Sequence, residues 1–465
     1  MQHGWRLYLC LFSAVFVIGC GLRFWQYGVF PPVGESADEL AWTMVGASLL
    51  QTGVPSSWSY FEYPQKVLQQ IHGNELPIVR PYLDHPPLFG FIPGSMQVLS
   101  GRDWADVLPV GTLRFPVVLL SCLNLVIFAL VLRVLFKDKL LQLIGFTLYA
   151  TSPMVVFSGR VIVAEQLLTT FLLLLVWWVV RAKKHRYDGV VLGLLSMAIV
   201  FTKASGIVLG FSLLVIAWLL GQRRRSIYMF AGLVLGFCGI LLYAMQYDFA
   251  LFLHIQAQQQ SWRYPGLLSS FMGLLFRPEL VNSVFFDGLF LTGVLSIFSQ
   301  FWRTKEPIVW QGMSLIVAFF CAFIFYAAGE TTLNELHGTR GGSLYGWYWY
   351  PLLPIFVLGI TRAVEAGLQK LLSTAMCLPL IVLAIPVVRL AYYGFSGTVP
   401  TEYLFPKLLI ALVMAGVFSS LLLARKWPRA VVVGLVCVVA ICNLLVIATM
   451  DSSLYWSDGS YWNQL

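Results

Sequence analysis

The segment RFPVVLLSCLNLVIFALVLRV, residues 114–134, decides the fold class of this chain. Between Arg114 and Arg133 it carries no charged residue. An apolar helix needs about 20 residues to cross the hydrocarbon core of a bilayer, and this segment supplies them. Comparable segments recur along the whole chain. They predict thirteen membrane-spanning helices, near residues 5–26, 114–134, 140–157, 162–180, 188–202, 205–221, 227–245, 284–301, 308–327, 349–361, 371–390, 404–424 and 430–448.

The composition of the whole chain agrees with a membrane protein. Of the 465 residues, 59% are hydrophobic and 11% are charged, and the mean hydropathy is +0.80. A soluble domain of this size could not bury so much apolar surface. The sequence therefore excludes a soluble enzyme, a secreted disulfide scaffold, a disordered protein and a nucleic-acid-binding protein. It predicts a single all-α, polytopic membrane domain over residues 1–465.

The net charge of +9 follows from how Lys and Arg are distributed about the predicted spans. Arg6 and the short connectors, with their flanking residues, hold 18 of the 30 basic residues but four of the 21 acidic ones. Cytoplasmic loops of membrane proteins carry such an excess of Lys and Arg. We therefore predict a cytoplasmic N-terminus, a C-terminus on the outside and no nucleic-acid partner. The basic connectors are 133–139, 181–186, 223–225, 303–305, 362–370 and 425–429.

The eight cysteines lie in apolar surroundings and form no CxxC pair. In such positions cysteine behaves as a small hydrophobic residue, so we expect neither a disulfide nor a cysteine metal site. One of them, Cys20, ends a Val-Ile-Gly-Cys run that resembles a lipoprotein cleavage site. An uncleaved first helix is the interpretation we prefer, and a cleaved signal stays open.

Three loops on the predicted outer side are long: residues 27–113, 246–283 and 328–348. Loops of more than about 15 residues in compact proteins are usually functional or disordered. These loops are rich in Trp, Tyr, Pro and Gly rather than in Ser or Lys, so we expect ordered caps over the spans. The first loop is expected to hold the catalytic motif, and the other two to shape the substrate sites.

The first loop contains an acidic pair, Asp38 and Glu39, at a predicted helix start. Ser36 is an N-cap candidate with Glu39 three residues later, which is the spacing of a capping box. The apolar residues on one face of this helix are Leu40, Met44, Ala47 and Leu50. They predict an amphipathic helix at the membrane surface. The two acids would then face water or a cavity above the lipid, or would only complement the helix dipole.

Further polar residues gather at the predicted outer ends of other spans, whereas the span interiors hold almost no charge. They are Asp84 and His85, Arg160 and Glu165, Lys203, and, in the third loop, Arg340 with Tyr345, Trp347 and Tyr348. Cations beside a carboxylate suit an anionic lipid headgroup, because cations bind the phosphate and the carboxylate accepts a hydroxyl proton. An ion-coupled transporter would instead place ionisable groups near the midplane. The aromatic residues of the third loop also fit an interface belt.

The order of these motifs resembles that of the GT-C superfamily of glycosyltransferases, which use polyprenyl-phosphate sugars. The lipid A aminoarabinose transferases and the protein O-mannosyltransferases are the most similar families. The matching segments are Asp38-Glu39, His85-Pro86-Pro87-Leu88, Arg114-Phe115-Pro116, Thr151-Ser152-Pro153, Gly159-Arg160 through Glu165, and Thr202-Lys203, in family order over the first half of the chain. In the second half, only the topology and Tyr350-Pro351-Leu352-Leu353-Pro354 match.

The resemblance implies roles for individual residues. Asp38 matches the catalytic base, and Glu39 would support it. Glu165 matches a second acid, often Asp in relatives, that is linked to metal binding near the base. The change from Asp to Glu leaves the use of a divalent metal ion by Glu165 and Asp38 open. The donor phosphate is expected near His85, Arg160, Lys203 and Arg340, and the candidates for other substrate contacts are Asp84, Tyr345, Trp347 and Tyr348.

We therefore expect a GT-C-like enzyme of the cell envelope. It would transfer a sugar, with inversion, from a polyprenyl-phosphate donor to a hydroxyl group of a glycolipid, glycan or protein at the outer face of the membrane, without a nucleotide cofactor. A bacterial cytoplasmic membrane is the expected location. The alternatives are a flippase or transporter of lipid-linked sugars, an oligosaccharide-transferring relative and a non-catalytic member of the same fold.

Overall fold

The structure, a computed structural model, describes residues 2–31, 38–181, 185–261, 288–301, 308–327, 346–370, 379–380, 382–384 and 428–449. Most of these residues are helical. The helices are α1 (Gln2–Phe24), α2 (Asp38–Thr52), α3 (Phe91–Leu99), α4 (Val110–Leu135), α5 (Lys139–Thr151), α6 (Pro153–Ser158), α7 (Glu165–Val180), α8 (Asp188–Thr202), α9 (Gly206–Leu219), α10 (Arg223–Tyr247), α11 (Phe249–Ser261), α13 (Leu289–Phe301), α14 (Ile308–Ala327), the 3-10 helix η1 (Gly346–Leu352), α16 (Leu353–Lys370) and α19 (Pro428–Thr449). The strands are β1 (Ser57–Trp58), β2 (Val67–Ile71) and β3 (Asn74–Val79).

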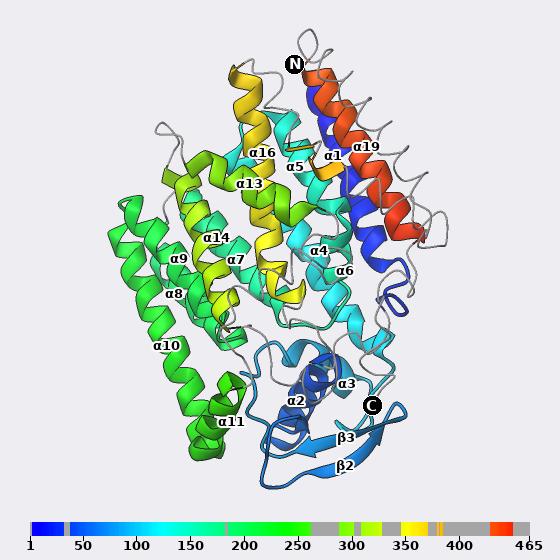
Figure 1. The fold of residues 1–465 in the computed structure, drawn as a ribbon, viewed down its shortest axis with the longest axis vertical. Helices are drawn as coiled ribbons and strands as arrows, with labels where there is room; N and C mark the ends of the chain where they lie inside the picture. Colours follow the sequence, from blue (N-terminus) through cyan, green and yellow to red (C-terminus); the bar gives the residue numbers. More distant parts are fainter. Residues whose placement is uncertain are drawn as a thin grey trace.

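The molecule consists of a large helical body and a smaller unit built from the first long loop. Figure 1 shows α2, α3 and the strands gathered at one end of the body, with α11 at that same end. The chain leaves the body after α1, builds the small unit, and returns through α4. The ends of several long helices therefore face the small unit.

The helical body has the character of a multi-pass membrane protein. Five described helices are long and apolar enough to cross a bilayer, and further apolar helices are shorter. Most of the predicted spans that fall within the described residues coincide with a single helix. The segment predicted at 404–424, and most of that at 371–390, lie outside the part of the chain that the structure describes.

One predicted span, residues 140–157, is in fact two helices. α5 ends at Thr151 and α6 begins at Pro153, with Ser152 in an extended conformation between them. Proline has no backbone N–H and disfavours helical geometry in the residue before it, so the helix is interrupted here. The apolar content of the segment was predicted correctly, but its continuity was wrong.

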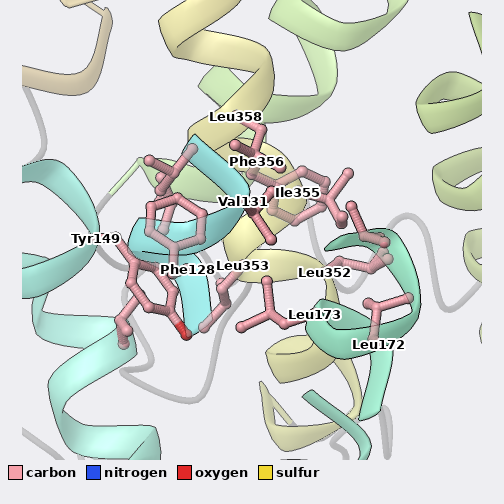
Figure 2. Close-up of a cluster of buried hydrophobic side chains, with 14 of the residues drawn as sticks. Phe128, Val131, Tyr149, Leu172, Leu173, Leu352, Leu353, Ile355, Phe356 and Leu358 are labelled. Carbon is pink, nitrogen blue, oxygen red and sulfur yellow. The ribbon is translucent and has the colours of Figure 1, made fainter. Parts of the chain in front are cut away.

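The core of the body lies where α4, α5, α7 and α16 meet. Figure 2 shows Phe128 and Val131 of α4 beside Tyr149 of α5, with Leu172 and Phe356 from the facing helices. All of these side chains are at most 3% exposed. Apolar packing of this density holds together the helices that carry the site.

A buried polar cluster lies at the far end of α8, away from the small unit. Asp188, the first residue of α8, accepts hydrogen bonds from Arg181 and Arg225, and from the indole of Trp178 at 3.0 Å. Both arginines belong to connectors that were predicted to be cytoplasmic. The cluster joins the end of α7 to the starts of α8 and α10.

The small unit has its own core, and this corrects the expectation of a surface helix. α2 begins at Asp38 as predicted, but nearly all of its residues from Glu39 to Ser48 are buried, on both faces. The helix α3 packs so closely on it that a Cβ atom on Gly46 would lie 1.9 Å from the carbonyl oxygen of Gly90. α2 is therefore an internal helix, because α3 and the sheet cover the face that was expected to meet water.

The three-stranded sheet of the small unit was not predicted. Its order is β1-β3-β2, and both pairings are antiparallel. β2 and β3 are joined by His72 and Gly73, which have φ values of 50° and 81°. Two consecutive residues with positive φ make the tight turn that suits a hairpin, and Gly is favoured there. The His-Gly pair between two short segments was the signal that could have revealed it.

Candidate functional site

The centre of the candidate site is an ion pair between the start of α7 and the end of the neighbouring helix α8. Glu165 is the first residue of α7, and Lys203 directly follows α8. The Nζ atom of Lys203 lies 2.6 Å from Oε1 of Glu165, and the two side chains are 12% and 3% exposed. The ring of Tyr348, in η1, lies 5.2 Å from the same Nζ atom. A partly desolvated ammonium is stabilised by both the carboxylate and the aromatic face.

Asp38 belongs to this site. It opens α2 and is half-buried. Burial alone would lower the pKa of Lys203, but the negative charge of Glu165 and, more weakly, that of Asp38 raise it. The sequence placed these three residues at the same end of the protein, and the structure brings them within electrostatic reach of one another.

Glu39 forms a buried ion pair with Arg114. Its carboxylate accepts hydrogen bonds from Nε and Nη2 of Arg114, at 2.8 and 2.6 Å, and from the backbone N–H of Ile162 at 3.1 Å. The side chains of Glu39 and Arg114 are 2% and 0% exposed. Nη1 of Arg114 also donates to the carbonyl oxygen of Pro31. Glu39 thus fastens the start of α2 to α4 and to the segment before α7, and it supports Asp38 by fixing its position.

Asp84 is buried rather than open to substrate. Ser59 and Tyr63 each donate a hydrogen bond of 2.6 Å to its carboxylate. Burial raises the pKa of Asp84 to about 7, and the charge of Asp38 adds to this rise, although the bonds from Ser59 and Tyr63 oppose it. Sequence analysis missed Ser59 and Tyr63, because nothing in their local pattern points to a carboxylate more than 20 residues away.

His85 lies beside Asp84 and is packed against the small unit. Its ring stacks on that of Trp42, with the centroids 5.0 Å apart and the planes inclined by 15°. The backbone carbonyl of Asp84 accepts a hydrogen bond of 3.0 Å from Gln259 of α11. The described part of the second long loop, α11, therefore contacts the Asp84–His85 segment, and its role in shaping a substrate site stays a prediction.

Arg160 does not fit the phosphate-binding role expected of it. The side chain is 0% exposed. It donates to the carbonyl oxygens of Leu22 at 2.5 Å and Phe30 at 3.3 Å, and its guanidinium lies over the ring of Phe157. These contacts fasten the end of α1 and the turn that follows it. Arg160 therefore has a structural role in this fold, because it is fully buried and joins the end of α1 to the segment before α7.

The expected residues of the third long loop are only partly described. Arg340 and Tyr345 lie outside the described residues. Trp347 is part of η1, next to Tyr348. Tyr348 contributes the ring beside Lys203, so of this group it is the residue that the structure brings to the site.

The described residues do not fit the divalent metal ion that the resemblance implies. Oε1 of Glu165 already accepts a hydrogen bond from the ammonium of Lys203. Within the described ranges, no three His, Cys, Asp or Glu side chains are grouped as metal ligands. Hard divalent cations need several oxygen ligands. The positive charge available to this part of the site comes from Lys203.

Comparison with known structures identifies the fold of this chain. No protein-family model and no curated protein matches the sequence. The crystal structure of ArnT from Cupriavidus metallidurans bound to undecaprenyl phosphate is similar, with a TM-score of 0.52 and 13% identity over 98% of this chain and 78% of that one. The apo oligosaccharyltransferase of Archaeoglobus fulgidus has a TM-score of 0.48 at 10% identity, over 94% of this chain and 56% of that one. At this identity the likeness to ArnT shows the fold alone, and this chain has a GT-C-like membrane fold, as the order of its motifs predicted.

Proposed function

We propose that the protein is an inverting glycosyltransferase that moves a sugar from a polyprenyl-phosphate donor to a hydroxyl acceptor. The observation that carries this proposal is the grouping of Asp38, Glu165 and Lys203 beneath the small unit, at the ends of three different helices. A carboxylate that can accept a proton stands there beside a cation that can bind a phosphate. Transfer from a phosphate-linked lipid needs both groups.

The proposed reaction assigns one task to each of these groups. The acceptor hydroxyl attacks the anomeric carbon while its proton passes to the carboxylate of Asp38. The bond from that carbon to the phosphate oxygen breaks, and its electron pair stays on the polyprenyl phosphate. Lys203 stabilises this growing negative charge, with His85 on the neighbouring segment as a further donor. Attack opposite the leaving phosphate inverts the anomeric configuration.

The fold supports a lipid donor. A related fold, that of ArnT, is known with undecaprenyl phosphate bound. In the present chain Glu165 and Lys203 lie at the ends of two apolar helices, α7 and α8, rather than in a separate soluble domain. A substrate whose tail lies in the bilayer can reach such a place from the side. We place the site at the outer face of a bacterial cytoplasmic membrane, with the N-terminus in the cytoplasm, because of the excess of Lys and Arg in the short connectors.

Purified protein in lipid nanodiscs tests the proposal. It is incubated with polyprenyl-phosphate sugars carrying a radiolabel in the sugar, and the label is followed out of the lipid fraction into an envelope glycolipid or glycoprotein extract. The proposed function requires that label leaves the lipid and that Asp38→Asn prevents this. If the label crosses the bilayer of a proteoliposome but stays on its lipid, the protein is a flippase of lipid-linked sugars instead.

A further inference from the structure

We propose that Lys203 takes the place of a divalent metal ion in this site, so that the protein works with a cation of its own and requires no metal. The inference rests on the proposed function and deepens it. It names the group that supplies the positive charge, and it predicts a catalyst that is indifferent to metal ions.

The position of the ammonium carries the inference. A divalent cation bound to a carboxylate lies roughly 2.0–2.6 Å from the oxygen. The Nζ atom of Lys203 already lies 2.6 Å from Oε1 of Glu165, at the outer edge of that range. Two cations cannot share one coordination position, and in a partly desolvated site they would repel each other strongly. A metal ion could bind Glu165 at this position only if Lys203 first moved away.

The surroundings of Lys203 keep it there. Glu165 is 3% exposed, so it would be an uncompensated buried charge without the lysine. The ring of Tyr348 at 5.2 Å covers the ammonium. The carboxylate of Glu165, 2.6 Å away, stabilises the positive charge of the ammonium.

The ammonium also has donors left for a substrate. It carries three N–H groups, and its bond to Glu165 uses one. In a metal-dependent transferase the ion would bind the phosphate and the acid together. Lys203 can do the same through the other N–H groups. One cationic side chain thus links the buried acid at the start of α7 to the place proposed for the leaving phosphate.

Two measurements on the full-length protein in nanodiscs test the inference. Binding of Mn²⁺ is followed by the loss of the free-ion signal in electron paramagnetic resonance, and transfer is followed with and without EDTA. Carboxylate-rich sites bind Mn²⁺, which makes it a suitable probe. The variants are Lys203→Met, Glu165→Gln, and Lys137→Met as a matched control at an exposed lysine outside the site.

We expect the native protein and Lys137→Met to bind no Mn²⁺ at the site and to retain full transfer in EDTA. Lys203→Met should bind no Mn²⁺ either, because too few acidic side chains of the described residues are grouped there, and it should lose transfer with or without EDTA. The inference is overturned if the native protein binds one Mn²⁺ ion that Glu165→Gln abolishes, if EDTA stops transfer, or if Lys203→Met retains full transfer. The Mn²⁺ measurement needs no turnover, so it decides the inference even if no donor is used. Absence of transfer from every lipid donor would count against the proposed function alone.

Discussion

The guanidinium of Arg114 holds the carboxylate of Glu39 by two hydrogen bonds, at 2.8 and 2.6 Å, across 75 residues of sequence. This pair separates the roles of two adjacent acids. Glu39 is saturated with donors and closed to solvent, whereas Asp38 is half-buried and lies within reach of the Lys203 charge. Of the two acids, the more exposed Asp38 is therefore the one that we propose as the base.

The change Asp38→Asn should therefore lower turnover by about 10²-fold or more, since the amide keeps the size of the side chain but cannot accept the proton. Binding of the lipid donor should persist, because the phosphate meets cations and not this acid. Donor affinity and single-turnover transfer measured on the same preparation check both statements. Asp106→Asn is the matched control, at an exposed acid of the same loop. Near-normal turnover of Asp38→Asn would mean that the residue only favours the start of α2.

The change Glu39→Ala should act on stability instead. It leaves the buried guanidinium of Arg114 without its counter-charge, which typically costs about 3–5 kcal/mol. The double change Glu39→Leu with Arg114→Met should recover much of this loss, because no charge then remains buried. Thermal unfolding in detergent gives the three values. Equal destabilisation by the single and double changes would contradict this account of the pair.

The stability of the small unit should depend on pH through Asp84. The pKa of this carboxyl is about 7 in the folded protein against 3.8 for an ordinary aspartate. Between these values the folded state holds a proton that the unfolded state has lost, so the free energy of unfolding falls as pH rises. The fall between pH 5 and pH 8 should be on the order of 2 kcal/mol. Asp84→Asn should remove it, and unfolding followed at both pH values in the two proteins is the measurement. An equal pH dependence in the variant would refute the assignment.

We expect opposite effects from substituting two cationic residues, Lys203 and Arg160. Lys203→Met should weaken donor binding by about tenfold or more, since a hydrogen bond to a charged group is worth ~1.5–3 kcal/mol. Arg160→Met should leave donor affinity unchanged and lower the melting temperature, because its contacts are with backbone carbonyls in the core. Equilibrium binding of a fluorescent polyprenyl phosphate, alongside thermal unfolding, separates the two effects. Loss of donor binding in a well-folded Arg160→Met protein would restore the role first expected of that residue.

Much of the fold was predictable, because the property that decides it is local. An apolar segment of membrane length, such as that of α4, can be recognised from its own residues. The local sequence also identified Asp38, Glu165 and Lys203 as candidate site residues. The partner of each charged side chain was not predictable from the sequence. Glu39 and Arg114 resemble a catalytic acid and an interfacial cation until the fold brings them together, and Arg160 resembles a phosphate ligand until its burial is seen.

The close contact of α2 with α3 has a consequence for how such a protein can diversify. Gly46 and Gly90 meet with no room for a side chain, and a Cβ atom on Gly94 would lie 2.4 Å from the backbone nitrogen of Ala47. The helix that begins with Asp38 is therefore locked to its neighbour through main-chain contacts that tolerate almost no mutation. Descendants of this chain could acquire new acceptors through changes away from this contact while inheriting the α2–α3 packing unchanged.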